Sequence, residues 1–209
     1  MKKLFWWLTI ILLFLSYTGE LTAELGQDKK QGEEDFGYKI DNYKADGIIS
    51  DGEYENRSVY RDLEIYWCND NKYLYMALRG KIKGYISIGF QPGSMMKDAD
   101  IIMGYVQDEK VEVFDQYSTG NFGPHPADEE LGGSNDIISY GGKESNDYTI
   151  IEFVRLLKTE DKYDHELKSG KNKIIWAYSH QDNPKASHVI RGYGEIEITL
   201  DEEREILNL

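Results

Sequence analysis

Sulfur and imidazole side chains are the groups of this chain whose types could bind a metal. Met95 and Met96 stand together in a polar segment between two apolar stretches, a poor place for purely core methionines. The histidines, four in number, are His125, His165, His180 and His188. No two of them have the close spacing that is typical of a structural zinc site. A thioether paired with an imidazole is the axial ligand set that raises the haem potential in electron-carrier cytochromes, so these residue types permit haem ligation without requiring it.

None of the common catalytic motifs is present. The sequence lacks a Gly-x-Ser-x-Gly elbow, a His-Glu-x-x-His pair, a P-loop and a dinucleotide-binding fingerprint. Carboxylates are so frequent, 38 in 209 residues, that pairs of them single out no acid–base site. We therefore expect that the protein is not an enzyme.

The charge and the cysteine content narrow the class of partner. The formal net charge is −14, which argues against nucleic acid and anionic membrane surfaces as partners. Cys68 is the only cysteine, so an intrachain disulfide is impossible. It lies in a strand-like run, and we interpret it as a packed structural thiol.

The segments that must position these residues are short strands. They are rich in aromatic and β-branched residues, several of them alternate, and turn residues separate them at short intervals. The predicted strands are residues 63–68, 73–79, 85–90, 101–106, 111–116, 137–140, 148–153, 173–178 and 194–199. The pattern predicts an all-β fold, an antiparallel β-sandwich of about ten strands. Trp67 and Trp176 are expected in its core, and Arg155 in a buried ion pair with Asp161 or Asp164.

One segment interrupts this rhythm. Residues 116–134 read QYSTGNFGPHPADEELGGS, rich in glycine and proline. Long ordered loops are often functional, and Tyr117 and Phe122 on this one could cover a cofactor or a sugar.

The order of the loop motifs resembles that of the DOMON domain, a sandwich module of exported cytochromes and of related sugar-binding proteins. The motifs are DG at 46–47, DGEY at 51–54, YISIGF at 85–90, MKDAD at 96–100, DQYSTG at 115–120, FVR at 153–155, TED at 159–161 with Asp164, IWAY at 175–178 and SHVIRG at 187–192. Each motif is short, and their succession over nearly the whole domain is what makes the resemblance specific.

The resemblance implies a b-type haem site formed by loops at one end of the sandwich. The haem-binding branch of the family has a methionine after the Gly-Phe strand and a histidine or lysine before the late Arg-Gly, positions that match Met96 and His188. These two residues would be the sixth and fifth iron ligands. Met95 is the alternative to Met96, and His180 and Lys185 are the alternatives to His188. The absence of Cys-x-x-Cys-His excludes covalent c-type attachment.

The chain departs from the family pattern at Asp98, which replaces a small residue. A carboxylate there would repel haem propionates unless Lys97, Lys185 or Arg191 offset it. The leading hypothesis is an electron-transfer cytochrome without oxygen chemistry, since two axial ligands would leave no open iron site. Its redox partner would be a separate chain, in the membrane or free.

Two other ligands stay open. The family's sugar-binding members and the many tyrosines make a carbohydrate or another small polar ligand the alternative to haem. Calcium binding by Asp46, Asp51 and Glu53 is the less favoured alternative to simple turns at these residues.

The N-terminus predicts export. Lys2 and Lys3 precede an apolar run that is shorter than the roughly 20 residues of a bilayer span, as in a secretory signal peptide over residues 1–23. Cleavage after Ala23 would release a periplasmic or extracellular protein, whereas an uncleaved signal would tether it to the membrane. We expect a flexible leader at 24–36, the sandwich at 37–200 and a tail at 201–209.

Overall fold

The computed structural model describes residues 43–201. The predicted signal peptide (1–23), the leader (24–36) and all but the first residue of the tail (201–209) lie outside the described residues, and so does the start of the predicted domain at 37–42. In the described part of the chain, no helix is long and apolar enough to cross a bilayer.

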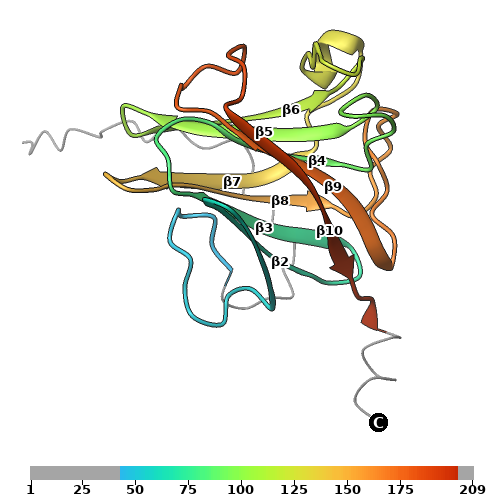
Figure 1. Cartoon of the computed structure of the whole chain (residues 1–209). Helices are drawn as coiled ribbons and strands as arrows, with labels where there is room; N and C mark the ends of the chain where they lie inside the picture. The colour runs from blue at the N-terminus through green and yellow to red at the C-terminus, as the bar shows by residue number, and fades with distance from the viewer. Residues whose placement is uncertain (1–42, 202–209) are drawn as a thin grey trace, which may run out of the picture. The chain divides into compact units, whose positions relative to one another are not determined.

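Ten antiparallel strands form two five-stranded sheets (Figure 1). The first sheet has the order β1-β2-β3-β8-β7, with β1 Asn56–Tyr60, β2 Leu63–Asn69, β3 Tyr73–Gly80, β8 Thr149–Leu156 and β7 Ile137–Glu144. The second sheet has the order β10-β9-β4-β5-β6, with β10 Ile190–Ile198, β9 Gly170–Tyr178, β4 Ile86–Phe90, β5 Asp100–Gln107 and β6 Lys110–Tyr117. A short 3-10 helix, η1 (Asp128–Leu131), follows β6.

The core lies between the sheets because alternate residues of each strand point to the same face. Ile65 of β2 pairs with Leu78 of β3, which in turn pairs with Ile151 of β8, and all three are fully buried. Trp67 and Trp176 are both in this core, as predicted. The predicted antiparallel β-sandwich of about ten strands is confirmed.

The outer face of the first sheet is covered by residues 43–54. Tyr43 and Tyr54 pack there against a small buried cluster that includes Tyr75 and the predicted structural thiol, Cys68. At Gly141 of β7 a β-carbon would collide with the carbonyl of Ala45, so this glycine allows the N-terminal segment to approach. The sequence prediction ended this strand at Tyr140, before the glycines, and missed the polar edge strand β1.

The loops of the second sheet emerge from opposite ends of it. Phe90, at the end of β4, pairs with Ile174 near the start of β9, whereas Tyr178, at the end of β9, pairs with Ile86. The β4–β5 loop (91–99) therefore leaves one end of the sheet and the β9–β10 loop (179–189) leaves the other. The sequence analysis expected the ligand loops together at one end. Because β9 runs antiparallel to β4 along its whole length, the β9–β10 loop instead begins at the opposite end of the sheet from the β4–β5 loop.

Candidate metal and cofactor site on the second sheet

A pocket lies on the outer face of the second sheet. Its cavity volume is about 60 Å³. Outward-facing side chains of β4, β5 and β9 line its base, and the three loops at 91–99, 118–127 and 179–189 surround it. A second hollow, with a cavity volume of about 670 Å³, continues it under Phe122, Pro124 and Lys185. The two share Tyr85, Met96, His125, His188 and Arg191, so they form one groove.

The pocket floor is apolar. We define it as Gly89, Ile101, Met103, Ile175 and Ala177. A β-carbon at Gly89 would come within 2.8 Å of Cγ1 of Ile175 and 3.1 Å of Cγ1 of Ile101. Because that carbon is missing, the side chains of Ile175 and Ile101 can close over the glycine and give the floor a continuous apolar surface.

The β4–β5 loop brings Met95 and Met96 to the pocket. Three of its residues that are not glycine, Gln91, Met95 and Asp98, have positive φ angles of 45°, 56° and 62°. Each such residue costs on the order of 1 kcal/mol, so the surrounding structure must impose this conformation. The amide of Asp98 donates to the carbonyl of Ser118, and the amide of Ser118 donates to the carbonyl of Ala99.

The β9–β10 loop brings His188 to the same pocket. The hydroxyl of Tyr85 donates to the carbonyl of Ala186 at 2.9 Å, and the hydroxyl of Ser179 donates to the carbonyl of Ser187 at 3.3 Å. These bonds fix the backbone just before the histidine. Burial, and then the charge of Arg191, lower the pKa of His188. Its imidazole is thus neutral at neutral pH, the form that binds metals.

His125 is a second imidazole in the pocket, and the sequence analysis did not single it out. Its Nδ1 lies 3.1 Å from Oε1 of Gln116 on β6. Burial lowers the pKa of His125, and the charge of His188 acts in the same direction. The prolines on both sides of His125, in the long loop, were the only feature of the sequence that could have indicated an ordered position for it.

The other predicted site residues divide into two groups. Arg191 lines the pocket, and Phe122, 77% exposed, lies at the adjoining hollow with Lys185. Tyr117 lines neither hollow, because its ring packs at 5.1 Å from that of Tyr163. His180 also lines neither hollow.

The predicted repulsion by Asp98 does not arise in the pocket itself. Neither Asp nor Glu is among the side chains that line the pocket over the floor. Asp98 lies outside this lining, and its Oδ1 accepts a hydrogen bond from Tyr117 at 3.3 Å. Arg191 makes no ion pair with any residue in the described range, so its charge is available to an anionic group at the rim.

The acidic turns near the N-terminus act as local caps. Oε1 and Oε2 of Glu53 accept hydrogen bonds from the amides of Lys44 and Ser50, and Oδ1 of Asp46 accepts one from Ile48. The less favoured prediction was a calcium site at Asp46, Asp51 and Glu53. The carboxylates of Asp46 and Glu53 already accept backbone amides, as in simple turns.

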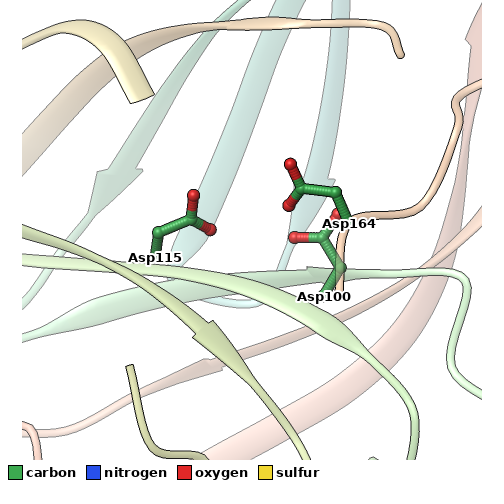
Figure 2. A group of neighbouring side chains, drawn as sticks. All are labelled: Asp100, Asp115 and Asp164. Carbon is green, nitrogen blue, oxygen red and sulfur yellow. The ribbon is translucent and has the colours of Figure 1, made fainter. Parts of the chain in front are cut away.

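Arg155 forms the predicted buried ion pair with Asp164, its Nη2 lying 3.5 Å from Oδ1. Its closer partner is Asp100 at 2.6 Å, which the sequence analysis did not identify. Figure 2 shows Asp100, Asp115 and Asp164 with their carboxylates turned toward one another. Burial raises the pKa of Asp115 to about 8, and that of Asp128 to about 7, with the neighbouring carboxylates adding to both shifts.

Comparison with curated proteins finds partial relatives. The chain is 28% identical over 150 residues to DBH-like monooxygenase protein 1 of Mus musculus, covering 69% of this chain and 23% of the relative. It is 27% identical over 127 residues to MOXD1 homolog 2 of Drosophila melanogaster, covering 60% of this chain and 16% of the relative. The chain thus spans less than a quarter of the length of these relatives.

These names correct one prediction. The sequence analysis expected that the protein is not an enzyme, because no catalytic motif is present. The similarity to proteins named as monooxygenases contradicts this expectation. Catalytic motifs of these relatives need not lie in this chain, because it spans less than a quarter of their length.

Comparison with solved structures and family models agrees on the fold. The cytochrome b domain of pyranose dehydrogenase from Coprinopsis cinerea superimposes with a TM-score of 0.52 at 11% identity, covering 68% of this chain and 80% of that one. The DOMON domain family model matches residues 60–179, which include Met95, Met96 and His125 and end before His188. That match covers more than half of the sequence, and the chain belongs to the DOMON domain family.

Proposed function

We propose that the pocket on the second sheet binds haem b, with Met96 and His188 as the axial ligands. The observation that carries the proposal is that these two residues, which enter from opposite ends of the sheet, line one apolar pocket. A thioether and a neutral imidazole are a suitable donor set for haem iron. The apolar floor suits the hydrocarbon edge of a macrocycle, and Arg191 suits a propionate.

The residues of the chain would prepare this site in three ways. The hydrogen bonds from Tyr85 and Ser179 hold the His188 loop, so that less entropy is lost when a ligand binds. The apolar floor would exclude water from the edge of the ligand. His125, held by Gln116, places a second neutral imidazole beside His188, where it could accept or donate a proton at the pocket rim. Bound haem would supply one-electron exchange.

We further propose that this module supports an oxidoreductase of the monooxygenase class. The curated relatives are named as monooxygenases, and one structural neighbour is a domain of a dehydrogenase. A redox-active module would then exchange single electrons with a catalytic centre or with a separate partner protein. Export to the periplasm or the cell exterior stays part of this proposal.

A haem titration of the purified full chain tests the site. We expect one equivalent of haem to bind and the reduced protein to show sharp α and β absorbance bands. Met96→Ala and His188→Ala should remove the low-spin bands, because each would lose an axial ligand. His180→Ala, on the same loop but outside the pocket lining, is the matched control and should leave the spectrum unchanged.

A chain that stays colourless with haem present would overturn the haem proposal. Unchanged bands in both Met96→Ala and His188→Ala would overturn the ligand assignment, and Met95→Ala and His125→Ala would then identify the ligands.

A further inference from the structure

The interior of the sandwich holds four aspartates at one end of the core. Asp100 begins β5, Asp115 is near the end of β6, Asp128 begins η1, and Asp164 lies in the β8–β9 loop. We call these residues the aspartate cluster. The register explains the arrangement: Asp115 pairs with Ile102, two residues beyond Asp100, so both aspartates point between the sheets.

These carboxylates are buried far more than charged groups normally are. The exposed fractions are 0% for Asp100, 4% for Asp115 and 1% for Asp128, and that of the Asp164 side chain is 1%. Taking one carboxylate oxygen from each of Asp100, Asp115 and Asp164, the three atoms lie within 4.8 Å of one another. Figure 2 shows the three groups converging from different segments of the chain.

A single cation compensates this charge. The guanidinium of Arg155 contacts Asp100 and Asp164, and no other Lys or Arg in residues 43–201 forms an ion pair with the cluster. Four carboxylates face one guanidinium, so the ionised cluster would carry an excess of three negative charges. Buried charges without partners are strongly unfavourable.

Asp128 gives an independent indication of a missing partner. Neither of its carboxylate oxygens has a hydrogen-bond partner in the described part of the chain, although the residue is buried. It lies close enough to Asp100 and Asp164 for their charges to act on it. One oxygen each of Asp100 and Asp115 and both oxygens of Asp164 also lack a hydrogen-bond partner there. Six buried oxygens of the aspartate cluster could thus each accept a bond, and those of Asp100, Asp115 and Asp164 lie close together.

We propose that the aspartate cluster binds one Ca²⁺ ion. Carboxylate oxygens are the ligands of hard cations, and the cluster has no sulfur donor. Oxygens bound to one Ca²⁺ at about 2.3–2.6 Å lie up to roughly 5 Å apart, so three carboxylate oxygens within 4.8 Å of one another fit this ion. Mg²⁺ demands near-octahedral geometry and usually keeps several waters, whereas Ca²⁺ accepts flexible coordination by several carboxylates.

The ion would join parts of the fold that no disulfide can join. It would link β5, β6, η1 and the β8–β9 loop. Asp100 directly follows the loop that carries Met95 and Met96, so the ion would also fix the C-terminal end of that loop.

Calcium binding to the full chain, treated with EDTA and then desalted, tests the proposal. We expect calorimetry to show one Ca²⁺ per chain. The thermal midpoint should rise by about 5–10 °C when free Ca²⁺ is 100 times the dissociation constant. Mg²⁺ at the same concentration should produce less than half of this shift.

The Asp128→Asn variant tests whether Asp128 binds calcium or has only a structural role. Asp128 accepts no side-chain hydrogen bond in the described residues, so the amide should fold, with a metal-free midpoint equal to or above that of the wild type. Its Ca²⁺ affinity should fall at least tenfold. Glu129→Gln, on the same 3-10 turn but exposed, is the matched control and should keep the full response.

Asp115→Asn, which retains an oxygen to accept the amide of Asp136, provides a second variant with the same expected loss of affinity. The proposal is overturned if the wild type shows no calcium-dependent shift, or if both variants bind Ca²⁺ as tightly as the wild type. A Mg²⁺ shift as large as that of Ca²⁺ would overturn the choice of calcium.

Discussion

At the scale of single residues, Glu152 joins the N-terminal segment to the first sheet. One of its carboxylate oxygens accepts the amides of Asp46 and Gly47, and the other accepts the hydroxyl of Tyr54 at 2.7 Å. Burial raises the pKa of Glu152 to about 7, and these hydrogen bonds oppose the shift without cancelling it. The segment that covers the outer face is therefore held by a group that titrates near neutrality.

This pKa predicts a pH dependence of stability. The folded chain binds the proton of Glu152 more tightly than the unfolded chain does. Protonation of Glu152 therefore stabilises the fold fully below pH 4.5, and this stabilisation is lost as the pH rises through about 7. Relative to Glu152→Gln, which does not titrate, the wild type should lose about 3 kcal/mol of unfolding free energy over this range. Urea unfolding at several pH values measures it.

The control for this experiment is Glu195→Gln on β10, at a side chain exposed to solvent. It should follow the wild type at every pH. A difference between wild type and Glu152→Gln that does not change with pH would contradict the prediction.

Most predicted residues of the pocket came from the family resemblance rather than from spacing. Met96 and His188 are far apart in the sequence, and nothing in their separation indicates that they line one pocket. The pairing of β4 with β9 brings them together, and strand pairing between distant segments is not visible in one sequence. His125 was missed for a different reason, because its contact with Gln116 lies within the long loop and only the two flanking prolines indicated it.

At the scale of elements, one face of β4 and β5 lines the pocket and the other packs in the core. Gly89 faces the pocket, whereas Gly104 faces the core, where a β-carbon would come within 2.8 Å of Cγ2 of Ile151. Glycine is thus needed for different reasons on the two faces: Gly89 belongs to the pocket floor, and Gly104 allows close packing in the core.

Alanine at these positions should separate the two roles. Gly89→Ala would place a methyl group on the pocket floor within 2.8 Å of Cγ1 of Ile175, so the haem affinity should fall at least tenfold and the thermal midpoint should fall as well. Gly104→Ala should lower the midpoint by overpacking the core, which typically costs about 1–3 kcal/mol, and leave haem binding in the folded chain intact. Absorbance titration and thermal unfolding measure both. Wild-type haem affinity in Gly89→Ala would refute the assignment of the floor.

The strands themselves were largely predictable, because each has a buried face that the alternation reveals. The exceptions have physical causes. The edge strand β1 contains Arg57 and Ser58 and exposes Val59, so it lacks an apolar face. The continuation of β7 runs through Gly141 and Gly142, which have little strand propensity. Gly141 is required by the approach of the N-terminal segment, and a β-carbon at Gly142 would come within 2.7 Å of the carbonyl oxygen of Ile150 on β8.

At the scale of the whole described domain, the two sheets differ in what covers them. Residues 43–54 close the outer face of the first sheet, and the outer face of the second sheet carries the groove. A sequence could predict a sandwich but not which face would stay open. The buried aspartate cluster was equally hidden, because Asp100, Asp115, Asp128 and Asp164 meet only when both sheets and two loops are assembled.

Met96 and His188 enter the pocket from opposite ends of the second sheet, and this arrangement affects how the two loops open when a ligand leaves. A ligand held by both would act as a cross-link between two peptide segments, 91–99 and 179–189, that share no strand. Its release would free both segments in a single event. Limited proteolysis should therefore show cleavage in the two segments rising together when haem is removed, and His188→Ala should expose both even with haem present. Cleavage that appears in one segment alone would indicate that the two loops open independently.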